Sequence, residues 1–140
     1  NGISQMVSYS GFIEHSQAVK LMQSAQLLLF VIPDVKENEL ILTGKLFEYL
    51  ASKTEIISFG PVSGNAAIIL HETGRAKMIN YTDEDEVKLQ LKNLIDRFSK
   101  RQSNKYSNTT HQKYSRKQQT EMLADKLEVI IKQSFSASSV

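Results

Sequence analysis

One ten-residue stretch combines the residue types that could bind a phosphorylated ligand. It spans residues 43–52 and has the sequence TGKLFEYLAS. The pattern predicts a helix that begins near Thr43 and Gly44 and carries the carboxylate of Glu48 one turn inside. The first backbone N–H groups of a helix have no partner within the helix, and with the helix dipole they favour phosphate. Thr43 can cap such a helix, and Gly44 lets a phosphate approach the backbone.

Two apolar segments place this helix at the edge of a sheet where ligands bind. Residues 27–32 have the sequence LLLFVI, which is apolar without alternation, as expected for a strand that is covered on both faces. Residues 55–59, EIISF, are the next expected strand. In open α/β sheets, ligands bind at the carboxyl ends of the strands. The sequence therefore predicts that helix 43–52 begins at that edge.

The order of the expected elements indicates an α/β fold. Hydrophobic periodicity and turn residues predict strands over residues 6–10, 27–32, 55–59 and 76–81. They predict helices over residues 15–25, 43–52, 63–72, 83–100 and 115–133. Because strands and helices alternate, we expect a Rossmann-like parallel sheet of about four strands with flanking helices. Thr82 or Asp83 should cap helix 83–100. We expect residues 1–140 to form a single domain.

The central stretch resembles the donor-binding half of group-1 glycosyltransferases of the GT-B fold. That family has a lysine or small polar residue here, then two apolar residues, an acid, an aromatic residue or Met, and Leu/Met-Ala. Residues 45–51, KLFEYLA, match this pattern. Residues 7–13, VSYSGFI, look like the family's strand ending in Gly, and the resemblance covers about residues 6–133. It implies part of an enzyme that transfers a sugar from a nucleotide-sugar donor, with retention, in glycan or cell-surface polysaccharide biosynthesis.

The resemblance also implies roles for individual residues. Glu48 is similar to the family's carboxylate that hydrogen-bonds the ribose of the donor nucleotide, a role suited to an acceptor-only group. Lys45 would stabilise the departing diphosphate, with Thr43 and Gly44 beside the phosphates at the helix start. Each residue also has a purely structural alternative. Glu48 could be an exposed helix residue that pairs with Lys45 or Ser52. Lys45 could be an exposed lysine of the first turn, and Thr43 an ordinary N-cap.

The contact to the donor sugar follows the family pattern only in part. Many members place a second Glu eight positions before the ribose-binding one, but position 40 is Leu in this sequence. Glu39, one residue out of register, is the nearest candidate, and an ordinary loop acid is the alternative. The sequence assigns no catalytic residue. We expect no metal or other cofactor, because the helix N-terminus and basic side chains would meet the phosphate charge.

The family's donor domain has further elements before the part that matches residue 6. Two strands and two helices normally precede it, and an acceptor-binding domain precedes those. We therefore expect an N-terminally truncated fragment that cannot transfer sugar alone, because donor and acceptor must be held together across a cleft. The missing strands would separate strands 6–10 and 27–32. We predict either that residues 6–10 pair beside residues 27–32, or that the exposed sheet edge pairs across a homodimer.

Composition excludes several other classes of protein. The 140 residues contain no Cys, which excludes a disulfide scaffold and thiolate metal sites. The three histidines, at positions 15, 71 and 111, are too scattered to indicate a metal site. No apolar run reaches the roughly 18 residues of a membrane span, and the first residues do not resemble a signal peptide. We expect a cytoplasmic protein, with peripheral attachment if it meets a membrane.

The positive charge is concentrated in one segment. Residues 97–120 contain seven Lys or Arg and no acid, although the formal net charge of the whole chain is only +2. Because Ser, Asn, Gln and Thr are abundant there, we expect residues 101–114 to form an exposed polar connection before the last helix. The segment favours an alternative function, a noncatalytic module that binds anionic membrane lipid or nucleic acid. Nucleic acid is the less favoured ligand, because few aromatic residues are interleaved and no known motif occurs.

Overall fold

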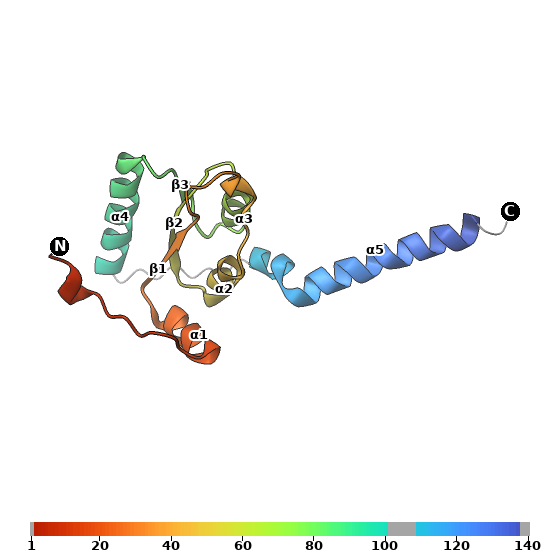
Figure 1. Ribbon diagram of the computed structural model, residues 1–140, viewed down its shortest axis with the longest axis horizontal. Coiled ribbons are helices and arrows are strands. Elements are labelled where there is room, and N and C mark those ends of the chain that lie inside the picture. The colour runs from red at the N-terminus through yellow and green to blue at the C-terminus, as the bar shows by residue number, and fades with distance from the viewer. Residues whose placement is uncertain (1, 101–108, 138–140) are drawn as a thin grey trace.

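The computed structural model describes residues 2–100 and 109–137, and within them it has an α/β fold (Figure 1). Three parallel strands form one sheet in the order β1 (Leu27–Val31), β2 (Glu55–Phe59), β3 (Met78–Ile79). The five α-helices are α1 (His15–Ser24), α2 (Gly44–Ser52), α3 (Asn65–Glu72), α4 (Glu84–Ser99) and α5 (Arg116–Ala137). Three short 3₁₀ helices are η1 (Ser4–Met6), η2 (Asn38–Leu40) and η3 (Thr109–Tyr114). The expected parallel α/β architecture is therefore confirmed, with one strand fewer.

The main core lies between one face of the sheet and helices α2 and α3. Leu46 and Leu50 of α2 are four residues apart, so they share a face, and both are almost completely buried. They pack in one apolar cluster with Phe30 of β1 and Leu70 of α3. This packing turns the opposite face of α2, which carries Gly44 and Glu48, away from the sheet.

Helix α4 lies on the other face of the sheet (Figure 1). Its buried residue is Leu94, and the Glu55–Arg97 ion pair, with 3.2 Å between Oε1 and Nη1, ties it to β2. Asp83 caps α4 as expected, since its side chain accepts a hydrogen bond from the N–H of Glu86 at 3.0 Å. Leu29 and Val31 of β1 are 57% and 51% exposed on this face. The prediction that residues 27–32 are covered on both faces is therefore wrong, because burial alternates along β1.

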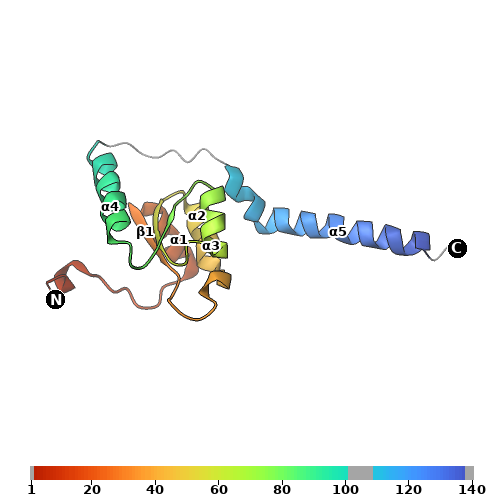
Figure 2. The same ribbon diagram turned by 90° about the horizontal axis from the view of Figure 1, so that it is seen from above.

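The first predicted strand does not form. After η1, residues 7–14 run outside the sheet (Figure 2), and Tyr9 and Phe12 are 94% and 96% exposed. The prediction that residues 6–10 pair beside residues 27–32 is wrong, and β1 is an edge strand of the sheet that the structure describes. A strand needs a neighbouring edge for its backbone hydrogen bonds, and local sequence does not supply one. Pairing of this edge across a homodimer remains a prediction.

Buried Arg75 joins α2 to the segment that leads into β3. Its guanidinium donates hydrogen bonds to the carbonyl oxygens of Leu50, of Thr54 at 2.6 Å and of Tyr49 at 3.3 Å. These carbonyls lie at the end of α2, where the helix leaves acceptors without helical partners. Lys53 ends the helix in the left-handed conformation, with φ of 61°. The end of α2 is thereby fixed, which fixes the direction in which its first turn points.

Helix α5 projects from the rest of the chain (Figures 1 and 2). Its apolar side chains are half exposed: Met122, Leu123, Leu127, Val129, Ile130 and Ile131. The helix spans 22 residues and begins and ends close to the expected bounds of 115–133. Of the predicted connection over residues 101–114, residues 101–108 lie outside the described part. The remainder forms η3, which packs on α2 and is not an exposed loop.

Candidate functional site

The first turn of α2 lies at the carboxyl edge of the sheet, as predicted, because α2 connects the end of β1 to the start of the parallel β2. The loops that leave the strands at this edge are joined to one another. The hydroxyl of Tyr81 donates to the carbonyl oxygen of Ile32 at 2.7 Å, and Asn38 Nδ2 donates to the Tyr81 oxygen at 3.2 Å. These bonds hold the loops after β1 and β3 in fixed positions relative to the start of α2.

Three glycines at this edge have different surroundings. A Cβ at Gly60 would lie 3.0 Å from Met78 Sδ and 3.1 Å from Ile32 Cβ, and a Cβ at Gly64 would lie 3.0 Å from the backbone of Glu39. At Gly44, a Cβ would meet no atom within 4 Å. Gly60 and Gly64 are therefore required by packing within the protein. Gly44 is not, and it leaves open space at the N-terminus of α2.

A cleft of about 1100 Å³ runs along the outer face of α2. Gly44 and Glu48 both line it, since residues four apart lie on the same side of a helix. The lining also includes an apolar surface formed by Leu42, Phe47, Leu50, Ala51 and Ile69. The opposite wall comes from η3 and the start of α5, with His111, Gln112, Tyr114, Ser115, Arg116 and Gln119. The structure thus places two predicted site residues in one hollow that combines apolar and polar groups.

Glu48 has a partner that the sequence did not indicate. Its side chain is 43% exposed, and its Oε1 lies 3.9 Å from Nδ1 of His15, a distance at which a protonated His15 forms an ion pair. The alternative pairing with Ser52 is wrong, since the Ser52 hydroxyl donates to the carbonyl oxygen of Tyr49 at 2.7 Å. Lys45 is exposed and has no ion-pair partner within residues 2–100 and 109–137. His15 is thus the side chain nearest to the Glu48 carboxylate, which is still accessible to a ligand in the cleft because Glu48 is 43% exposed.

Thr43 and Lys45 lie at the start of α2 but do not line the cleft. Thr43 occupies the N-cap position with extended backbone, φ −117° and ψ 152°, and its side chain makes no cap hydrogen bond. Its carbonyl oxygen accepts from the N–H of Leu46 at 3.1 Å. The plain N-cap alternative thus lacks its defining bond. Lys45 is exposed beside the mouth of the site, where its flexible side chain can reach a charged ligand.

Glu39, the candidate for the donor sugar, lies apart from Glu48. It sits in η2, its side chain is exposed, and it does not line the cleft. Its backbone packs against Gly64. Glu37, directly before η2, has a left-handed backbone with φ of 59°. The structure therefore does not bring the sugar and ribose candidates together in one cavity.

The sequence does not predict the wall formed by η3, because that wall depends on contacts across more than forty residues. Tyr114 packs on Phe47 of α2, with ring centroids 6.0 Å apart and an interplanar angle of 44°. Glu72 of α3 accepts hydrogen bonds from Tyr114 at 2.6 Å and from Lys113 Nζ at 2.5 Å. The hydrogen bonds of Lys113 and then Tyr114 lower the pKa of the Glu72 carboxyl. The sequence feature that points to this wall is the presence of two tyrosines, Tyr106 and Tyr114, within the basic segment 97–120.

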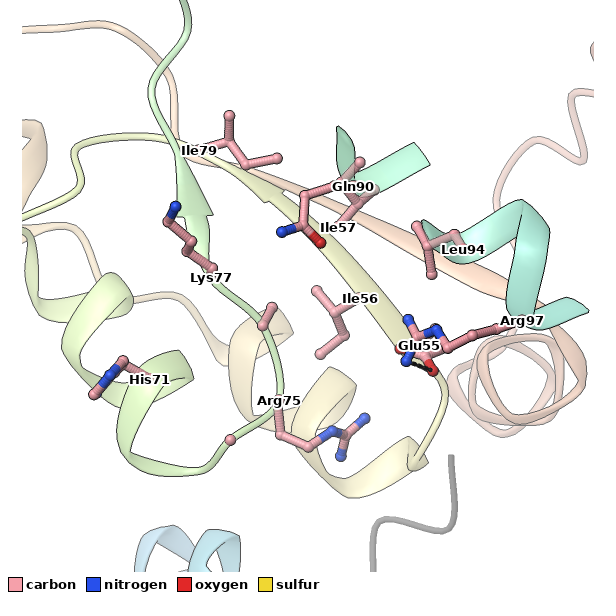
Figure 3. Close-up of a pocket in the computed structure, with 12 residues that line it drawn as sticks. Glu55, Ile56, Ile57, His71, Arg75, Lys77, Ile79, Gln90, Leu94 and Arg97 are labelled. Carbon is pink, nitrogen blue, oxygen red and sulfur yellow. Dashed lines mark ion pairs between the residues drawn. The ribbon is translucent and has the colours of Figure 1, made fainter. Parts of the chain in front are cut away.

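A second, smaller hollow of about 430 Å³ lies beside β2 and α4 (Figure 3). Its cations already have partners inside the protein. Arg97 pairs with Glu55, and Lys77 Nζ lies 3.1 Å from Glu86 Oε1, while Arg75 donates to backbone carbonyls. This hollow is consequently a product of structural ion pairs, and the cleft along α2 is the better candidate for a binding site.

Comparisons with known proteins add no assignment: no protein-family model, no curated protein and no solved structure matches the chain. Among the described residues, no group of three or more His, Asp or Glu side chains is placed to hold a metal ion. None of the helices described here has the length and apolar character needed to cross a membrane. The functional assignment therefore rests on the cleft itself.

Proposed function

We propose that this chain binds the donor nucleotide of a glycosyltransferase that transfers a sugar from a nucleotide-sugar, with retention, in glycan or cell-surface polysaccharide biosynthesis. One observation carries the proposal. Gly44, which leaves the N-terminus of α2 open, and the carboxylate of Glu48 line the same cleft along the outer face of α2, the helix that begins at the carboxyl edge of the sheet. The sugar acceptor would be bound by a separate domain of the enzyme, so these 140 residues should not catalyse transfer by themselves.

Two groups on the first turns of α2 would bind the nucleotide: the backbone N–H groups at its N-terminus and the carboxylate of Glu48. The diphosphate would lie at the N-terminus of the helix, where backbone N–H groups and the helix dipole favour negative charge. The exposed ammonium of Lys45 would add positive charge as the diphosphate departs. Glu48 would accept hydrogen bonds from the ribose hydroxyls, and the apolar surface around Phe47 would receive the nucleoside.

Calorimetric titration with UDP, GDP and ADP tests the proposal. Glu48→Gln should weaken binding of the preferred nucleotide by ~1.5 to 3 kcal/mol, the usual cost of losing a hydrogen bond to a charged group. Glu84→Gln is the matched control, because Glu84 is an exposed acid on α4, on the opposite face of the sheet. Equal affinities for wild type and Glu48→Gln would exclude the ribose contact, and binding of none of the three nucleotides would exclude the proposed function.

A second candidate function, attachment to an anionic membrane surface, rests on the exposed apolar side chains of α5 next to the basic segment. The charge available for this role is smaller than the sequence indicates. Lys113 and Arg97 pair with Glu72 and Glu55, and Lys117 lies 4.0 Å from Glu121. Flotation with phosphatidylserine vesicles would test it. Binding that persists at high salt, where exposed charges are screened, would rule out the electrostatic part of this function.

A further inference from the structure

The segment η3, residues 109–114, is held on the outer face of the α/β body by contacts with two helices. The ring of Tyr114 packs on Phe47, and the carboxylate of Glu72 accepts hydrogen bonds from both Tyr114 and Lys113. Lys113 Nζ also lies 4.9 Å from the centroid of the Tyr114 ring. The segment is thus attached to α2 by an aromatic contact and to α3 by an ion pair.

The position of Glu72 at the end of α3 favours its contact with Lys113 and Tyr114. Glu72 is the last residue of α3, where the helix dipole disfavours a negative charge. The ammonium of Lys113 compensates that charge, and the Tyr114 hydroxyl satisfies a further lone pair. An unneutralised carboxylate at this helix end would be unfavourable, so the ion pair adds to the preference for the docked position.

Docking of this segment determines the shape of the cleft. Gly44, Glu48 and the apolar surface belong to the side formed by α2 and α3, whereas the facing wall consists of η3 and the start of α5. That wall contributes the guanidinium of Arg116 and the imidazole of His111, two groups that can meet an anionic ligand. Without the wall, the outer face of α2 would lie open to solvent.

We propose that residues 109–114 act as a strap, whose docking through Tyr114 and Glu72 closes one side of the nucleotide cleft and is coupled to binding of a nucleoside diphosphate. The inference rests on the proposed function for the identity of the ligand, and on the contacts of Tyr114 and Glu72 for the strap. Coupling is reciprocal. If docking of the strap raises the affinity for the ligand, binding of the ligand stabilises the docked strap by the same free energy.

Accessibility of the cleft can be measured without any ligand. The chain contains no Cys, so Ile69→Cys places a single thiol at a buried position that lines the cleft, and Asn93→Cys on α4 is an exposed control outside it. Tyr114→Ala should accelerate maleimide labelling at position 69 by about tenfold, because an aromatic contact and a hydrogen bond are lost together. Glu72→Gln, which retains the ring contact, should accelerate it by about threefold. Labelling at position 93 should not change.

Titration of the same variants with UDP, GDP and ADP separates the two proposals. We expect Tyr114→Ala to weaken binding of the preferred nucleotide severalfold, and that nucleotide to slow labelling at position 69 in the protein with an intact strap. Unchanged labelling in both strap variants would overturn the strap, as would faster labelling with unchanged nucleotide affinity. If labelling responds to both variants while none of the nucleotides binds the wild type, the strap's docking stands and the proposed function fails.

Discussion

Replacement of Gly44 by Ala tests whether this glycine is needed for nucleotide binding or for the stability of the fold. A glycine in the first turn of a helix costs roughly 0.5 to 1 kcal/mol relative to alanine, because it loses more conformational freedom on folding. A Cβ at Gly44 meets no atom within 4 Å, so the substitution introduces no clash within the protein. We therefore expect Gly44→Ala to raise the free energy of unfolding by up to about 1 kcal/mol, or to leave it unchanged.

The same methyl group should impair nucleotide binding. It would occupy the open space at the N-terminus of α2, where the backbone N–H groups would meet the diphosphate. Loss of one hydrogen bond to a charged group is worth ~1.5 to 3 kcal/mol, so affinity should fall by about tenfold or more. Calorimetric titration with the preferred nucleotide, together with urea denaturation, gives both quantities for one protein preparation.

Gly60→Ala is the matched control for this prediction. Its Cβ would approach Met78 Sδ and Ile32 Cβ to about 3 Å, so it should destabilise the fold by about 1 to 3 kcal/mol. Opposite effects on stability at two glycines of the same sheet edge would show that only one of them is structural. Gly44→Ala protein with wild-type affinity for all three nucleotides would refute the assignment of the phosphates to this helix end.

Three further predictions concern stability and assembly. Lys53→Gly should stabilise the protein by about 1 kcal/mol in urea titrations, because Lys53 has a left-handed backbone that glycine adopts without strain; a loss of stability would contradict this. Hydrogen bonds from Lys113 and Tyr114 lower the pKa of Glu72 below its ordinary 4.5, so their stabilisation is complete above that value and is lost as the pH falls through the lower folded-state pKa. Glu72→Gln should therefore lose less stability than wild type as the pH falls below 4.5, and equal losses would argue against the ion pair. The uncovered edge of β1 (Leu27–Val31) should pair across a homodimer in sedimentation experiments, and a monomer at high concentration would exclude this assembly.

The strap and the helix α2 show how differently the two walls of the cleft are encoded. The position of α2 follows from short-range information: the apolar run before it, the Thr-Gly start, and the spacing of Leu46 and Leu50. These features also predicted the parallel order of β1 and β2 and the sheet edge at which Gly44 lies. That Gly44 and Glu48 lie on the same side of α2 follows from helical periodicity, so the sequence was sufficient for that, whereas the hollow they line also needs the wall formed by η3.

Tertiary structure decided what meets these residues from elsewhere in the chain. The segment over residues 6–10 has the pattern of a strand but remains outside the sheet, since strand formation requires a partner edge at the right place. Glu39 is near Glu48 in sequence yet lies outside the cleft, because η2 packs against Gly64. The Tyr114–Glu72 contact joins residues 42 positions apart. Local patterns determine which face of an element is apolar, whereas long-range packing determines which polar groups finally face one another.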